Sequence, residues 1–124
     1  MLKKELLLCG GGKKGSHGIT VGKSDNTSLT DYGYYYQSWD SNLVPNTVDG
    51  KLVQSLSNDS GDGLSLAFSD YGKGSSNSYK ITRLDTNASL TLSWEFFYYR
   101  NKSGGTFFTP SDVGKTIQLN IEAV

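Results

Sequence analysis

The chain has 124 residues, a length that fits one domain with a single hydrophobic core and needs no disulfide bonds to hold it. Its 12 basic and 12 acidic residues cancel, so the net charge gives no general attraction to nucleic acid or to a membrane surface. Hydrophobic residues make up 35% and aromatic residues 12%, so the core must depend strongly on Tyr, Phe and Trp. The 15 glycines favour short strands joined by turns over helices.

The first fifteen residues differ from the rest of the chain. Four leucines precede a glycine-rich stretch at 10–15: Leu2, Leu6, Leu7 and Leu8. We expect an N-terminal apolar strand or arm and a flexible tether over 1–15, followed by one domain over 16–124. Pairing of this arm with a neighbouring subunit and pairing within its own sheet both fit the pattern. Three consecutive leucines are too few for an export signal or a membrane-spanning segment.

The body of the chain is predicted to contain seven to nine short strands and almost no helix, because no window shows a sustained period of 3.6 residues. Turns are expected around Pro45-Asn46, Asp49-Gly50 and Asn58–Gly63, where turn-forming residues gather. In chain order, the predicted strands cover 19–21, 32–39, 51–56, 64–68, 79–83, 90–98 and 117–123.

The last two of these strands have the clearest pattern. Apolar residues occupy every second position from Leu90 to Tyr98 and again from Ile117 to Ala123, which places each set on one face of a strand. Just before the final strand, Asp112-Val113-Gly114 weakly resembles the corner of immunoglobulin-like domains, and a type I turn ending in glycine is the better explanation of it. Short strands at these intervals indicate a sandwich or barrel, and we expect an all-β, single antiparallel immunoglobulin-like β-sandwich.

Aromatic residues are concentrated in the segments 32–39 and 94–99 and fall on both faces of each predicted strand. When both faces are aromatic, one set belongs to the core and the other covers an interface or a ligand. We assign to the core Tyr34, Trp39, Trp94 and Phe96. We expect contact with another chain at Tyr35, Phe97 and Tyr99. If the protein binds a sugar, Tyr35 and Trp39 are the expected platform.

No catalytic or metal-binding motif accompanies these aromatics. Six residues after Gly10 stands Ser16, where a phosphate-binding loop requires lysine. The single histidine, His17, and the single cysteine, Cys9, cannot make a four-ligand zinc site, and His17 is expected to be a solvated loop residue. We therefore expect no enzyme activity, no cofactor and no metal.

Several short motifs give the chain a family resemblance. Ile19-Thr20-Val21-Gly22 precedes Tyr32-Gly33-Tyr34, a Pro45-Asn46-Thr47 turn leads to Gly50-Lys51, and the motif Phe108–Lys115 closes the chain. In this order the motifs resemble small β-domains of tailed bacteriophages and prophages. Trp39-Asp40-Ser41 departs from the small Gly/Ser run expected before the proline turn. The resemblance implies a location in the virion, and it implies no reaction.

The sequence thus favours a virion structural protein, a capsid decoration or a tail or fibre component, that acts by protein–protein assembly and forms a homo-oligomer. Its expected partners are other virion proteins. We do not expect it to bind nucleic acid or a membrane. The alternative is a carbohydrate- or receptor-binding module of a tail fibre, with a host surface glycan as its ligand.

Overall fold

The computed structural model describes residues 15–22, 35–36, 43–59 and 63–124, and at 15, 35, 36 and 59 it describes the backbone alone. Among these residues it contains nine strands and two short 3₁₀ helices. The strands are β1 (Gly15–Thr20), β2 (Tyr35–Tyr36), β3 (Thr47–Val48), β4 (Lys51–Asp59), β5 (Gly63–Phe68), β6 (Ser78–Arg83), β7 (Ser89–Glu95), β8 (Tyr98–Asn101) and β9 (Thr116–Ala123). The helices are η1 (Lys102–Gly104) and η2 (Pro110–Asp112). None of the described residues forms a helix long and apolar enough to cross a membrane.

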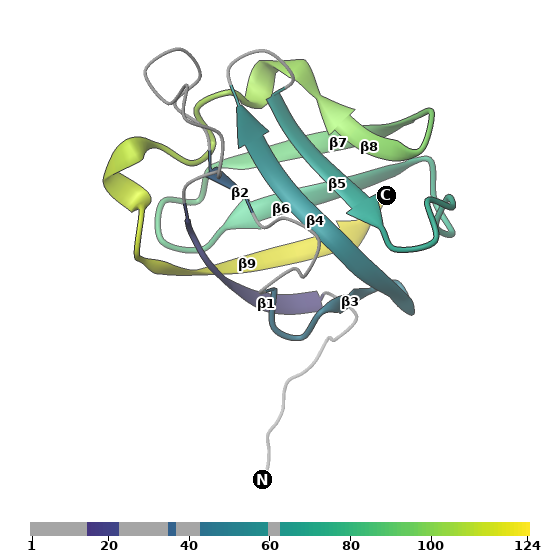
Figure 1. Ribbon diagram of the computed structural model, residues 1–124, viewed down its shortest axis with the longest axis horizontal. Helices are drawn as coiled ribbons and strands as arrows, with labels where there is room; N and C mark the ends of the chain where they lie inside the picture. The colour runs from purple at the N-terminus through teal and green to yellow at the C-terminus, as the bar shows by residue number, and fades with distance from the viewer. Residues whose placement is uncertain (1–14, 23–34, 37–42, 60–62) are drawn as a thin grey trace, which may run out of the picture.

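All the strands belong to one antiparallel sheet that curls around the core. Its order is β1-β9-β6-β7-β8-β5-β4-β2, and β3 forms a hairpin with β4. Figure 1 shows β4 and β5 crossing in front of β6, β7 and β9, so that the two ends of the sheet face each other across the interior.

The two ends of the sheet are also bonded to each other. Gly18 of β1 and Val44, just before β3, exchange two backbone N–H···O hydrogen bonds of 2.8 Å. One residue along, His17 Nε2 lies 2.8 Å from the carbonyl oxygen of Thr47. The sheet therefore continues from β1 through this junction to β3 and β4, and the free edge of β1 is partly covered.

The prediction of an antiparallel all-β fold with essentially no helix is confirmed, and the turn at Asp49-Gly50 lies where it was expected. The immunoglobulin-like sandwich is not confirmed, because the strands form one curled sheet instead of two separately bonded layers. Of the predicted arm and tether at 1–15, residues 1–14 lie outside the described residues, and Gly15 is the first residue of β1. Of the predicted strand at 32–39, only Tyr35 and Tyr36 are described, where β2 pairs with Asn58 and Ser57.

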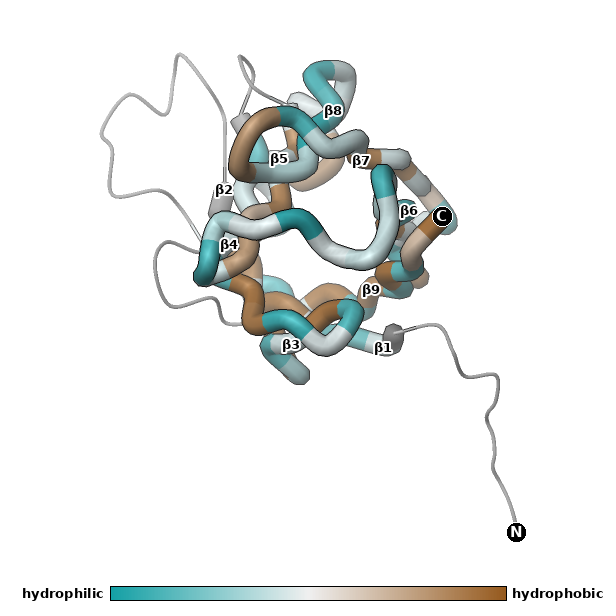
Figure 2. Tube along the Cα trace, turned by 90° about the vertical axis from the view of Figure 1, so that its right-hand side faces the viewer, coloured by the Kyte–Doolittle hydropathy of each residue, from teal (hydrophilic) through white to brown (hydrophobic). Residues whose placement is uncertain are grey.

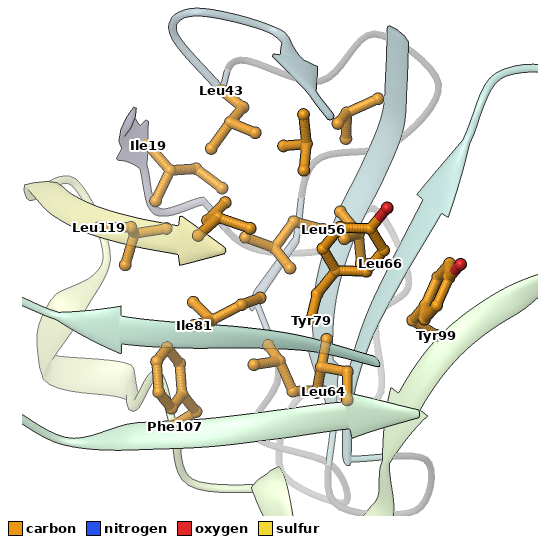
Figure 3. Close-up of a cluster of buried hydrophobic side chains, with 14 of the residues drawn as sticks. Ile19, Leu43, Leu56, Leu64, Leu66, Tyr79, Ile81, Tyr99, Phe107 and Leu119 are labelled. Carbon is orange, nitrogen blue, oxygen red and sulfur yellow. The ribbon is translucent and has the colours of Figure 1, made fainter. Parts of the chain in front are cut away.

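The core follows the period of two that the sequence shows. In β9, Ile117, Leu119 and Ile121 are buried while the residues between them face outward. Figure 3 shows Ile19 and Leu119 pointing towards Leu56 from the opposite side of the core. The hydropathy colouring of Figure 2 likewise mixes apolar and polar positions along the strands. One continuous cluster of buried residues fills the inside of the sheet.

A buried ion pair fixes the long connection between β8 and β9. Arg83, at the end of β6, donates to Asp112 of η2 from two guanidinium nitrogens at 2.8 and 3.2 Å, and to the Phe107 carbonyl oxygen at 2.8 Å. The side chains of Arg83 and Asp112 are both buried. Their contact holds the connection that carries Phe107 and Phe108 into the core.

Breaking this pair should lower the free energy of unfolding more than removing an exposed partner of the same arginine does. Asp112→Ala leaves a buried guanidinium without its buried carboxylate partner, and we expect the free energy of unfolding to fall by about 3 to 5 kcal/mol. Asp85→Ala removes the half-exposed partner of Arg83, and the expected loss is under about 1 kcal/mol. Urea denaturation of both variants measures the difference, and equal losses would show that burial of the pair contributes nothing.

The same pair should make stability depend on acid pH. Hydrogen bonds from Arg83 hold the pKa of Asp112 below its usual value of 3.8. A depressed pKa means that the ionised carboxylate stabilises the fold above the unfolded-state value and that this contribution is lost as pH falls through the folded-state pKa. The stability difference between wild type and Asp112→Asn should therefore be largest at pH 5 to 7 and shrink below about pH 4. Urea titrations at several pH values test this, and a constant difference would contradict it.

Candidate functional site

The hairpin between β7 and β8 ends in an unusual turn. Glu95 pairs with Tyr98, so Phe96 and Phe97 are the only two residues of the loop, and both have positive φ angles, 23° and 78°. Two-residue hairpin turns with positive φ normally contain Asn-Gly or similar residues, because a bulky side chain is strained there. The alternation from Leu90 to Tyr98 therefore stops at Glu95, since the chain reverses at the next two residues.

Both rings of this turn lie at the surface. Phe96 is 74% exposed and Phe97 is 49% exposed, and their ring centroids are 3.9 Å apart. The expectation that Phe96 belongs to the core is wrong, because the turn directs it away from the sheet interior. Phe97 is at the surface, and its contact with another chain stays a prediction.

A third aromatic residue joins them from the connection between β5 and β6. Tyr71 is 47% exposed, has a φ angle of 56°, and its ring centroid lies 6.2 Å from that of Phe97. Gln54 donates a hydrogen bond of 3.1 Å to its hydroxyl oxygen, which fixes one end of the ring. We call Tyr71, Phe96 and Phe97 the aromatic tip. Each has a backbone conformation that disfavours large side chains, and such strain concentrates at functional positions.

Beneath the tip lies a rigid aromatic base. Tyr99 is fully buried and makes edge-to-face contacts with Phe68, Tyr79 and Trp94, with centroids 4.7 to 5.9 Å apart. Its hydroxyl donates to the carbonyl of Ser76 and accepts from the amide of Gly74, both at 2.8 Å. The expectation that Tyr99 contacts another chain is wrong, because its ring and hydroxyl are used within the fold. Trp94 packs against the core, as expected.

Asp49, in the turn between β3 and β4, binds the same connection from the other side. One oxygen of its carboxylate accepts hydrogen bonds from the Ser75 amide, at 2.8 Å, and from the Tyr79 hydroxyl. Hydrogen bonding to the Ser75 side chain first, then to the Tyr79 hydroxyl, and to a smaller extent to the Ser75 amide, lowers the pKa of Asp49 below its usual value. Burial and the neighbouring Asp49 anion raise the pKa of Tyr79, so it stays a neutral donor. The segment 69–77 is thus held by Tyr99 and Asp49, which leaves Tyr71 beside Phe97.

The other predicted site residues lie elsewhere. Five of them lie outside the described residues: Leu2, Leu6, Leu7, Leu8 and Trp39. Tyr34, which was expected in the core, lies outside them too. Of Tyr35 only the backbone is described, paired with Asn58. His17 is buried in β1 and is not a solvated loop residue, because Gly15 to Thr20 form a complete strand with β9.

Sequence reasoning missed Phe96 and Tyr71 as surface residues. No Gly, Asn, Asp or Pro stands between Trp94 and Arg100, so the hairpin gives no turn signal. Tyr71 follows Ser69-Asp70, which does signal a turn, but a single tyrosine in a loop carries no further information.

Comparisons with known proteins do not assign a family. No family model, no curated protein and no solved structure matches the chain. Within the part of the chain that the structure describes, no three His, Cys, Asp or Glu side chains are close enough to hold a metal ion.

Replacing the turn by residues suited to it should stabilise the protein. In Phe96→Asn/Phe97→Gly, two positive φ angles become favourable, and we expect a gain of about 1 kcal/mol in the free energy of unfolding, since strain of this kind costs about 1 to 3 kcal/mol per residue. Thermal and urea denaturation measure the gain. A less stable variant would show that the two rings are there to hold the fold and not to meet a partner.

Proposed function

We propose that the protein is a non-enzymatic structural protein that docks onto a partner protein through the aromatic tip. The observation that carries the proposal is the gathering of three exposed aromatic residues, all with positive φ angles, from two separate connections. Moving an exposed aromatic side chain from water into a partner's pocket is favourable because apolar surface is buried. Aromatic residues therefore contribute much of the binding energy of protein–protein interfaces.

The geometry of the rings favours a protein over a sugar. A sugar ring stacks on a flat aromatic face, usually within a concave site. Here the planes of Phe96 and Phe97 meet at 41°, and those of Tyr71 and Phe97 at 69°. The rings form an angular group at the end of a hairpin, and such a group fits into a hollow of another protein better than it supports a flat ligand.

Ion pairs flank the tip in sequence. Glu95, directly before Phe96, binds Arg100, and Asp70, directly before Tyr71, binds Lys51 at 2.7 Å. In both pairs, an exposed carboxylate is neutralised by the basic side chain that it binds. An apolar centre with a polar, neutralised rim is the usual composition of a protein–protein interface.

The setting proposed for this docking is a phage particle, as a capsid decoration protein or a tail or fibre component that forms a homo-oligomer. The support is the order of motifs from Ile19 to Lys115 that resembles phage β-domains. The N-terminal leucines are proposed as a second anchor, and an immunoglobulin-like β-sandwich is proposed as the fold class of the curled sheet. A glycan-binding fibre module is the competing proposal.

Incorporation into particles tests the proposal. The full chain is expressed during growth of the phage or prophage that encodes it, and purified particles are analysed by quantitative mass spectrometry. We expect the wild type to co-purify and Phe96→Ala/Phe97→Ala to be reduced at least tenfold, because two aromatic anchors are removed. Leu84→Ala is the matched control, since it removes a half-exposed apolar side chain outside the tip.

Two results would reject the proposal. One is wild-type protein absent from the particles, and the other is equal incorporation of the tip variant. A glycan array separates the competing function: binding lost on Trp39→Ala but kept in the tip variant would favour a fibre module, and a flat array counts against it.

A further inference from the structure

The aromatic tip is an open cluster of rings at one end of the sheet. Figure 1 shows the turn between β7 and β8 and the connection between β5 and β6 on the same side of the molecule, at the right of the view. Phe97 is the middle ring, because its centroid lies 3.9 Å from that of Phe96 and 6.2 Å from that of Tyr71. The proposed docking function leaves open which protein the tip meets, and the shape, size and charge of the tip all bear on that partner.

The rings of the tip are tilted against one another. The planes of Phe96 and Phe97 meet at 41°, and those of Phe97 and Tyr71 meet at 69°. A tilted group of exposed rings presents ring edges and ring faces to solvent together. Aromatic rings pair best when the edge of one meets the face of another, with centroids about 4.5 to 7 Å apart. A second copy of the tip offers the same edges and faces, so the cluster can extend across two copies.

The exposed area of the tip fits a weak association of two copies. Phe96, Phe97 and Tyr71 are 74%, 49% and 47% exposed. At about 150 to 250 Å² per aromatic side chain, the three rings leave on the order of 350 Å² in water. Two tips packed together bury on the order of 700 Å², and the polar side chains around them bring the total towards the roughly 1,200 Å² at which specific interfaces begin.

The charges of the chain also permit this pairing. The 12 basic and 12 acidic residues cancel, so two copies have no net repulsion. Lys73, two residues after Tyr71, is exposed, and none of the ion pairs among the described residues involves it. At the other side of the tip, the Glu95 side chain directly before Phe96 is 47% exposed. The Tyr71 side of one tip is therefore complementary in charge to the Phe96 side of another.

Shape, size and charge agree on one arrangement. On the basis of the proposed docking function, we propose that the partner is a second copy of this chain, bound tip to tip around a two-fold axis beside Phe97. In a two-fold interface each contact occurs twice, with the roles of the two residues exchanged. Phe96 of each copy packs on Tyr71 of the other, and Lys73 of each copy faces Glu95 of the other.

Sedimentation equilibrium of the full chain tests whether the tip mediates self-association. We expect a monomer–dimer equilibrium in the wild type, and concentrations up to about 0.5 mM cover the weak affinity of an interface of this size. Phe97→Ala should raise the dissociation constant about tenfold or more, because the ring at the axis is lost from both copies. Leu84→Ala is the matched control and should leave the constant unchanged, since Leu84 is a half-exposed apolar residue outside the tip.

Mixing two variants tests the two-fold pairing itself. A homodimer of Phe96→Ala or of Tyr71→Ala lacks both Phe96–Tyr71 ring pairs, whereas a mixed dimer keeps one complete pair. Unlabelled Phe96→Ala should therefore bind ¹⁵N-labelled Tyr71→Ala about three- to tenfold more tightly than either variant binds itself, the factor expected of one aromatic pair. Titrations followed by ¹H–¹⁵N NMR measure these constants, and the same spectra show whether each variant keeps the fold.

Three results would each overturn the proposed pairing: a wild type that stays monomeric, a mixed dimer no tighter than the homodimers, or equal effects of Phe97→Ala and Leu84→Ala. A monomeric wild type whose tip variant is lost from phage particles identifies another virion protein as the partner, so that the docking function stands and the pairing fails. Self-association through the tip in a protein that is absent from the particles supports the pairing and rejects the phage setting.

Discussion

The fold depends on the pair of backbone hydrogen bonds between Gly18 and Val44, each 2.8 Å long. Without them β1 would be an open edge, and the sheet would have two distant ends instead of one enclosed interior. Closure places Ile19 in one buried cluster with Leu43 and with Ile117 and Leu119 of β9. It also brings the His17 ring beside Thr47, whose carbonyl oxygen lies 2.8 Å from His17 Nε2.

The buried cluster consists mainly of aliphatic residues and contains two tyrosines, Tyr79 and Tyr99, whose hydroxyl groups need partners because they are buried. Figure 3 shows Tyr79 and Tyr99 with their oxygen atoms on the same side of the cluster. Both hydroxyls form hydrogen bonds, that of Tyr79 with Asp49 and that of Tyr99 with Gly74 and Ser76. Gly74 must be glycine here, since a Cβ would lie 1.9 Å from the Tyr79 hydroxyl oxygen. The aromatic composition of the core thus determines how the connection 69–77 is held.

The sequence predicted what depends on local pattern. The alternation from Ile117 to Ala123 and the Asp49-Gly50 turn both correspond to the structure, because a period of two and a favoured turn pair are local properties. Phe96 was assigned to the wrong environment because its turn is stabilised by the pairing of β7 with β8, and no residue in it favours a turn. His17 was expected in solvent because its burial results from the pairing of β1 with β9, about a hundred residues later. The sequence shows neither feature, because the β7–β8 hairpin has no turn-forming residue and the β1–β9 pairing is a long-range contact.

The strained turn at Phe96-Phe97 persists because its flanks are fixed from several directions. Trp94 and Tyr99 pack ring against ring across the hairpin at 5.0 Å, and Glu95 binds Arg100 on the outer face. The guanidinium of Arg100 also lies 4.9 Å from the centre of the Tyr98 ring. Backbone strain survives only where the surrounding structure leaves the chain no easier conformation. Asn-Gly would relieve that strain at this position. Two exposed phenylalanines gain nothing comparable from their own fold, and this imbalance is the physical reason for proposing that they meet a partner surface.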